Sequence, residues 1–188
     1  MQHHEIEGRF LEINKEAVCQ RLTAIGATDY GEHLLEETIF EVVGDHKKIL
    51  KLRSQCGVST LISKERFSGQ PEFATESELV VTDVEAAKDF INALGFPSLR
   101  VQQKKRHTFR LDDLTFDIDL WPLIPPYIEI EGPDLPRIQR AAELLGLTWN
   151  RVTLADPREI IVERYGIPLD ALGWYTFNHI ERHDAQPL

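Results

Sequence analysis

Pairs of like-charged residues, two positions apart, recur along this chain of 188 residues. Glu5 and Glu7 are followed by Arg9, and Lys51 is followed by Arg53. Carboxylate pairs suit hard divalent cations such as Mg²⁺ or Mn²⁺, whereas Lys and Arg side chains bind phosphate groups. The same alternation continues in Lys64 and Arg66, Glu76 and Glu78, Lys104 and Arg106 with Arg110, Asp117 and Asp119, and Glu129 and Glu131. The two sets together favour a site for a polyphosphate and a divalent metal.

The alternation also predicts the secondary structure that positions these residues, because residues i and i+2 share one face of a β-strand. Strands are expected at 3–13, 34–43, 47–56, 58–66, 72–82, 99–111, 114–121 and 126–132. Gly44-Asp45 and Asp112-Asp113 are typical turn residues between successive strands. Short connections favour antiparallel neighbours, so we expect an α+β fold: a closed eight-stranded antiparallel β-barrel, or tunnel, with helices packed outside.

A single charged strand face is usually the solvated side of a half-exposed sheet. Here seven of the eight predicted strands carry such pairs, with like signs clustered within a strand. Like charges on one strand repel each other unless a ligand or an opposing strand neutralises them. An interior made of these faces cannot be a dry core, because burying unpaired charge is too costly. We therefore predict a wet cavity with a highly charged ligand.

Helices are expected where a capping residue precedes an apolar periodic segment. Three such segments run from Asn14 to Gly26, from Asp83 to Gly95 and from Asp134 to Gly146. A shorter helix is expected from Asp156-Pro157 to Tyr165-Gly166. These helices would cover the outside of the barrel.

The composition narrows the possible partners. The net charge is −10, from 21 basic and 31 acidic residues, which argues against a general attraction to nucleic acid or to an anionic membrane. Two cysteines are too few for a disulfide framework, and no apolar stretch approaches the ~20 residues of a membrane span. The N-terminus lacks the features of a signal peptide, so a cytoplasmic protein is expected, either a monomer or a homodimer.

The segment Glu5-Ile-Glu7-Gly-Arg9 resembles the ExExK signature of the CYTH domain, found in the triphosphate tunnel metalloenzymes. Later segments match in order: Leu50-Lys51-Leu52-Arg53, Lys64, Glu76-x-Glu78, Lys104-Lys105-Arg106, Asp117-Ile118-Asp119 and Tyr127-Ile128-Glu129-Ile130-Glu131. The resemblance spans residues 3–146. It implies one CYTH-like domain over residues 1–188, in which 147–188 form a C-terminal helical extension.

The resemblance also implies site residues and a cofactor. Carried over by position, the residues that hold Mg²⁺ or Mn²⁺ are Glu5, Glu7, Glu78, Asp119, Glu129 and Glu131. The residues that bind the triphosphate are Arg9, Lys51, Arg53, Lys64, Lys104, Arg106 and Arg110. The expected catalytic set is Glu5, Glu7, Lys64 and Arg9.

Two residues depart from the family pattern. Arg9 stands where the signature has lysine, and it cannot readily transfer a proton. Phe40 stands where some tripolyphosphatases carry a tyrosine that helps to orient water. Beyond Gly146, the aromatic residues Trp149, Trp174, Tyr175 and Phe177 are expected to form a lid or outer packing.

Three functions remain open. The first is a class IV adenylate cyclase-like enzyme, which converts ATP to cyclic AMP and pyrophosphate. The second is a hydrolase of inorganic tripolyphosphate, thiamine triphosphate or a nucleoside triphosphate. The third is a non-catalytic module that binds polyphosphate. A shared tunnel that contacts phosphate does not separate them.

Overall fold

The computed structural model describes residues 2–42, 48–67 and 70–184. Strands occupy all eight of the predicted regions: β1 Gln2–Phe10, β2 Thr28–Phe40, β3 Lys48–Gln55, β4 Val58–Phe67, β5 Gln70–Val81, β6 Ser98–Leu111, β7 Leu114–Leu120 and β8 Tyr127–Gly132. The predicted turn at Gly44-Asp45 lies outside the described residues. The turn at Asp112-Asp113 joins β6 to β7 as predicted.

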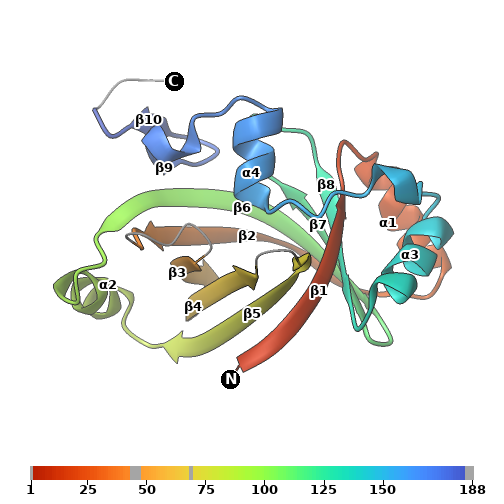
Figure 1. Ribbon diagram of the computed structural model, residues 1–188, viewed down its shortest axis with the longest axis horizontal. Helices are drawn as coiled ribbons and strands as arrows, with labels where there is room; N and C mark the ends of the chain where they lie inside the picture. Colours follow the sequence, from red (N-terminus) through yellow and green to blue (C-terminus); the bar gives the residue numbers. More distant parts are fainter. Residues whose placement is uncertain (1, 43–47, 68–69, 185–188) are drawn as a thin grey trace.

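These strands form one curled antiparallel sheet in the order β6-β2-β3-β4-β5-β1-β8-β7 (Figure 1). β7 also pairs with β6, but only along Lys105–Leu111, whereas β2 pairs with β6 along most of its length. β1 pairs with β5 through Gln2–Ile6 and with β8 through Ile6–Phe10.

The prediction of an α+β fold with a curled antiparallel sheet is confirmed, but the sheet does not close into a barrel along its whole length. The reason is strand length: β7 and β8 have 7 and 6 residues, against 14 in β6. These two short strands cannot cover the full height of the longer ones, so one side of the sheet stays open.

The chain after Gly146 lies beside this open side. It contains η1 Trp149–Arg151, α4 Pro157–Glu159, the π-helix η2 Ile160–Arg164, η3 Leu169–Ala171, β9 Leu172–Tyr175 and β10 Ile180–Arg182. β9 pairs with β6 in parallel at Val101 and Gln102, next to the part of β6 that β7 does not reach. The segment predicted as a helical extension is therefore mixed, with two short strands that extend the sheet.

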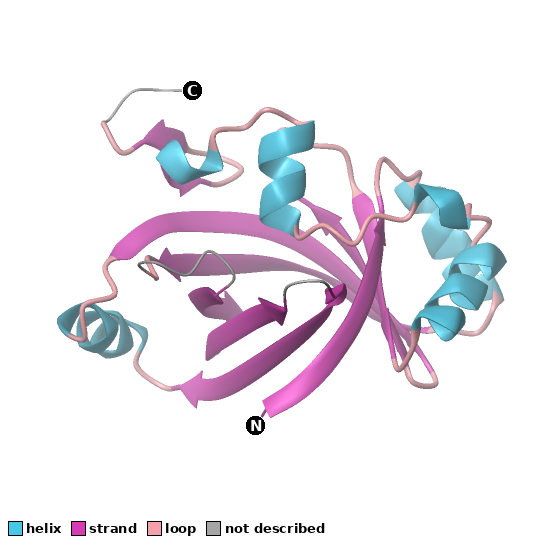
Figure 2. Ribbon diagram, in the orientation of Figure 1, coloured by secondary structure: helices cyan, strands magenta, loops and turns pink. Residues whose placement is uncertain are grey.

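The three longer helices begin at the predicted caps. They are α1 Lys15–Ala24, α2 Val84–Ala93 and α3 Leu135–Leu144, and their N-cap side chains Asn14, Asp83 and Asp134 each accept a hydrogen bond from a backbone N–H of the first turn. Figure 2 shows all three helices outside the curled sheet. Among the described residues, no helix is both long and apolar enough to span a membrane.

The main hydrophobic core lies between the outer face of the sheet and the helices. Leu22 of α1 and Ile138 of α3 belong to the same buried cluster as Ile118, Ile128 and Ile130 of β7 and β8. Along β7 and β8 the apolar residues of this cluster alternate with charged residues, so the charged residues face the inside of the curl.

Candidate functional site

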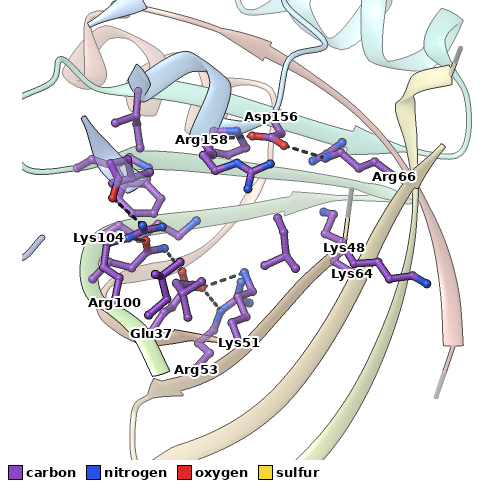
Figure 3. Close-up of a pocket in the computed structure, with 18 of the residues that line it drawn as sticks. Glu37, Lys48, Lys51, Arg53, Lys64, Arg66, Arg100, Lys104, Asp156 and Arg158 are labelled. Atoms are coloured by element: carbon purple, nitrogen blue, oxygen red, sulfur yellow. Dashed lines mark hydrogen bonds and ion pairs between the residues drawn. The ribbon is translucent and has the colours of Figure 1, made fainter. Parts of the chain in front are cut away.

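A cavity of about 480 Å³ lies inside the curled sheet, with part of its wall formed by the segment around α4. Among the described residues that line it, ten are Lys or Arg and eight are Asp or Glu, although the whole chain carries a net charge of −10. The basic residues are Arg9, Lys48, Lys51, Arg53, Lys64, Arg66, Arg100, Lys104, Arg106 and Arg158. Figure 3 shows that the basic residues it labels approach the cavity from several walls. The lining is therefore net positive in an acidic protein.

Strand alternation explains why β3 presents its cations to the cavity. Lys51 and Arg53 line the cavity, and Leu52 between them is 2% exposed and packs outward in a cluster with Phe40 and Ile91 of α2. The outward packing of Leu52 fixes which face of β3 points inward. Phe40 also borders the cavity, and it carries no hydroxyl group with which to orient water.

One ion cluster joins β1, β4 and β8 around Arg9. The Arg9 Nη2 atom lies 2.6 Å from a carboxylate oxygen of Glu7 and 2.6 Å from one of Glu129. Its Nη1 atom donates to the Ala155 carbonyl oxygen at 2.9 Å. Glu7 also contacts Arg66, and its carboxylate lies 3.5 Å from Lys64 Nζ. Arg9, Glu7 and Lys64 of the predicted catalytic set therefore meet, whereas the side chain of Glu5 lies outside the described part of the chain.

This cluster shifts the pKa values of its members. Burial raises the pKa of Glu7, but the charges of Arg9, Lys64 and Arg66 outweigh this effect and lower it to about 2. Burial also disfavours the charged form of Arg9, yet Glu129 and Glu7 raise the Arg9 pKa above its ordinary value. Glu7 and Arg9 therefore stay charged across the physiological pH range.

A second cluster surrounds Glu37 of β2, which is 2% exposed. Lys51 Nζ and Arg53 Nε each lie 2.9 Å from Glu37 Oε1, and the Gln102 side-chain amide donates to Oε2 at 2.8 Å. Burial and the neighbouring Arg53 charge lower the pKa of Lys51 to about 8 despite the contact with Glu37. The sequence-based prediction missed Glu37, because its neighbours two positions away, Leu35 and Ile39, are apolar.

A third cluster lies behind the cavity wall at β6 and β7. Asp119 is completely buried and accepts from Lys104 Nζ at 2.7 Å and from Arg106 Nε at 2.6 Å. Asp117 binds the same guanidinium, with Arg106 Nη1 at 2.6 Å. Neither aspartate lines the cavity, whereas Lys104 and Arg106 do. Asp119, predicted as a metal ligand, holds two cavity cations in place here.

Two other predicted site residues also lie away from the cavity. Arg110 is exposed, and its guanidinium stacks over the Tyr30 ring at 5.2 Å, because β6 continues past the end of the cavity. Glu78 shares the inward face of β5 with Glu76, but it is exposed and does not line the cavity. Strand alternation predicts the face on which a residue lies, but it does not predict how far along the tunnel axis that residue lies.

The cavity also contains cations that the sequence-based prediction did not include. Arg100 donates to the Gln102 side-chain oxygen at 3.0 Å and to the Leu169 carbonyl oxygen at 2.8 Å. Arg100 lies four residues before Lys104 and therefore on the same face of β6, so strand alternation could have identified it. Arg158 follows Asp156, whose side chain caps α4, and no local pattern places either residue in a cavity formed mainly by residues 7–131. The four aromatic residues noted after Gly146 do not line the cavity, but Tyr175 packs against Trp121, which does.

The described carboxylates, as they are arranged, do not fit a divalent metal at the Glu7–Glu129 pair. Both oxygens that face each other across β1 and β8 are bound to Arg9. Within residues 2–42, 48–67 and 70–184, no group of three His, Cys, Asp or Glu residues is placed to hold a metal ion. The arrangement is suited to binding a guanidinium.

Comparison with known proteins finds solved structures that share the fold of this chain. No protein-family model matches the sequence, and no curated protein matches it. The protein PH1012 of Pyrococcus horikoshii OT3 superposes with a TM-score of 0.72 at 27% identity, covering 81% of this chain and 96% of its own. A Vibrio parahaemolyticus protein proposed to be an adenylate cyclase gives a TM-score of 0.70 at 15% identity, covering 85% of this chain and 98% of its own.

A proposed adenylyl cyclase from Hippeastrum, described as having a dominant triphosphatase activity, gives a TM-score of 0.57 at 16% identity. That match covers 90% of this chain and 99% of the Hippeastrum chain. At such identities the two cyclase-like structures show that the fold is shared. The Pyrococcus protein shares it over nearly its whole length.

Proposed function

We propose that this chain, which has the fold of the CYTH domain, is an enzyme that binds a triphosphate in its cavity. The observation that carries the proposal is the net positive lining of a cavity inside an acidic protein. Such a lining suits a ligand with several negative charges, and triphosphate is the ligand that the family resemblance implies. The fold shared with two proposed cyclases supports the same reading.

The cations lie on separate walls, so an extended anion can contact several of them at once. Lys51 and Arg53 come from β3, Lys64 from β4, Arg106 from β6 and Arg158 from α4. Guanidinium groups bind phosphate through two parallel hydrogen bonds, and ammonium groups act as point charges. We propose that these residues bind the phosphate groups of the triphosphate.

The same cavity has an apolar part that suits an organic group. Ile39, Ile49, Leu99, Ile161 and Leu169 line it together with the cations. The volume of about 480 Å³ falls within the range of pockets for drug-sized ligands. We therefore favour an organic triphosphate, and ATP with a class IV adenylate cyclase-like reaction is our first candidate.

In that reaction the ribose 3′ hydroxyl loses its proton to solvent and its oxygen bonds to the α-phosphorus. The bond from this phosphorus to the bridging oxygen breaks, and pyrophosphate leaves with the electron pair. Lys and Arg side chains stabilise the negative charge that develops on the phosphates. A carboxylate with a pKa of about 2 is a poor proton acceptor at neutral pH. We therefore assign Glu7 to holding Arg9, Lys64 and Arg66 in position.

The second candidate is hydrolysis of a triphosphate at the same cations, with water as the nucleophile. It is favoured by the Hippeastrum structure, which shares this fold and is described as having a dominant triphosphatase activity.

Product identification separates the two candidates. The purified protein is incubated with ATP, thiamine triphosphate or tripolyphosphate, with and without added Mg²⁺ or Mn²⁺. Cyclic AMP with pyrophosphate supports the first candidate, and orthophosphate supports the second. Arg53→Ala should lose turnover, whereas Arg110→Ala should keep it because Arg110 is outside the cavity. Tight binding without turnover would indicate a non-catalytic module, and absence of both would refute the proposal.

A further inference from the structure

We infer that the guanidinium of Arg9 takes the place of a divalent metal ion at the Glu7–Glu129 pair, so that this pair binds neither Mg²⁺ nor Mn²⁺. The inference concerns a cofactor of the proposed active site and so rests on the proposed function. Its test measures metal binding to the protein alone, and it can therefore succeed or fail independently of any turnover.

The first argument is the space that Arg9 fills. Its Nη2 atom lies 2.6 Å from Glu7 Oε1 and 2.6 Å from Glu129 Oε2. A Mg²⁺ ion bonds carboxylate oxygens at about 2.0–2.1 Å. An ion bonded to both of these oxygens would stand where Nη2 now lies. Metal and guanidinium therefore compete for one position.

The second argument is that several contacts hold Arg9. Its side chain is 1% exposed, and Nη1 donates to the Ala155 carbonyl oxygen. The backbone of Arg9 exchanges two hydrogen bonds with Thr153, each 2.9 Å long. A displaced Arg9 guanidinium would remain charged, because arginine is not deprotonated in proteins. It would also give up its contacts with Glu7, Glu129 and Ala155 in a buried place. The C-terminal segment thus holds the guanidinium between the two carboxylates.

The third argument is local charge. Glu7 also contacts Arg66 and lies 3.5 Å from Lys64, and Glu129 lies 3.3 Å from Arg106. The two carboxylates therefore contact four cations, Arg9 included, although Lys64, Arg66 and Arg106 also have acidic partners in Glu76, Asp156 and Asp117. The four cations nearest the pair would each repel a further double positive charge at this point.

The test is Mn²⁺ binding by electron paramagnetic resonance, on metal-stripped protein without any substrate. The wild type should show no Mn²⁺ binding that depends on Glu129, so its titration should match that of Glu129→Gln. Arg9→Met removes the charge at similar length, and it should gain one bound Mn²⁺ per chain. This gain should disappear in the Arg9→Met, Glu129→Gln double variant. The matched control is Arg110→Met, which removes an exposed arginine and should gain nothing.

Thermal unfolding gives a second readout. Mn²⁺ should raise the melting temperature of Arg9→Met and leave that of the wild type unchanged, because only in the variant is the place between the two carboxylates no longer filled by a guanidinium. The inference is overturned if the wild type binds one Mn²⁺ that Glu129→Gln abolishes. That comparison needs no Arg9 variant, so it decides the matter even where Arg9→Met does not fold. Turnover measured in the product assay would still stand in that event.

Discussion

At the scale of single residues, buried carboxylates hold the cavity cations in place. Glu37 binds Lys51 and Arg53, and Asp119 binds Lys104 and Arg106. A long, flexible cation that is already fixed by a partner loses less conformational entropy when it meets a phosphate. The carboxylates of this cavity are therefore part of the proposed phosphate-binding arrangement, although they would repel the phosphate itself.

The first prediction concerns Glu129, which binds both Arg9 and Arg106. From the sequence alone, removing one of two like charges on β8 should leave stability unchanged or raise it. The contacts argue otherwise, because Glu129→Ala leaves two buried guanidinium groups without this partner. We expect the free energy of unfolding, measured by urea denaturation, to fall by about 3–5 kcal/mol.

The control for this measurement is Glu78→Ala, which removes an exposed glutamate from the same inward face of the sheet. Its unfolding free energy should stay within about 0.5 kcal/mol of the wild type. Equal stability of Glu129→Ala and the wild type would show that the Arg9–Glu129 pair contributes nothing.

The second prediction is a pH dependence that comes from Lys51. Its pKa is lowered to about 8 by burial and by the charge of Arg53. The ammonium that attracts phosphate is therefore present below pH 8 and is lost as the pH rises through this value. The affinity for tripolyphosphate, measured by calorimetry, should weaken above pH 8 by at most about tenfold per pH unit.

Lys51→Arg is the matched variant, because it keeps the positive charge throughout this pH range. The ionisation of the ligand is the same for both proteins, so only the difference between their profiles reports on Lys51. Parallel profiles would mean that Lys51 does not titrate in the binding reaction.

At the scale of elements, the alternation within each strand allowed much of the site to be predicted. It put Lys51, Arg53 and Lys64 on the faces that the structure turns inward, because the side chosen by a strand residue is a local property. It failed where position along the tunnel matters. Arg110 has the parity of Arg106 but lies beyond the cavity, and Asp119 faces inward but is covered by Lys104 and Arg106.

The contribution of α4 could not be predicted in this way. The capping residue Asp156 allowed the helix to be placed in the sequence, yet nothing near it indicates that the helix covers the open side of a sheet made by residues 2–132. That placement depends on tertiary contacts, such as the hydrogen bonds between Arg9 and Thr153 and the pairing of β9 with β6.

The third prediction tests this element. Arg158 of α4 lines the cavity, so Arg158→Ala should remove a charged hydrogen bond to the triphosphate. The loss is about 1.5–3 kcal/mol, or roughly tenfold to a hundredfold in dissociation constant.

Arg164→Ala is the control within the same segment. Arg164 is half-exposed and binds Glu12 with Nη2 2.8 Å from Oε1, away from the cavity. Calorimetric titration of both variants with tripolyphosphate gives the comparison. If Arg158→Ala binds as tightly as Arg164→Ala, the α4 segment is a wall of the cavity without a part in binding phosphate.

At the scale of the whole molecule, the antiparallel curled sheet and the helices on its outside were predictable, whereas the extent of its closure was not. Closure depends on how much of β6 the short strand β7 covers and on the length of its neighbour β8, and these two strands end at Leu120 and Gly132. The alternation of apolar and charged residues does not by itself show that these strands are too short to close the sheet. The C-terminal segment lies at the open side, so the cavity is lined both by the strands of the curled sheet and by residues 156–170.

The fourth prediction follows from the proposal that this cavity, built by the whole chain, binds phosphate. A ligand present at about 100 times its dissociation constant stabilises the folded state by about 2.7 kcal/mol. For a chain of this size, tripolyphosphate should then raise the melting temperature by roughly 5–10 °C. Adenosine lacks the phosphates and should raise it little. An equal shift with adenosine would mean that the cavity is mainly a base pocket.

The contrast between an acidic exterior and a basic interior also has a kinetic consequence. A free triphosphate in solution approaches a molecule of net charge −10, and it is repelled until it comes within about 8–10 Å of the cationic lining. Raising the ionic strength from a low value should therefore speed up association, the reverse of the usual behaviour of oppositely charged partners. It should also speed up dissociation, because the contacts inside the cavity are screened. Stopped-flow measurements at increasing salt would show whether encounter is slow and residence long, as the distribution of charge requires.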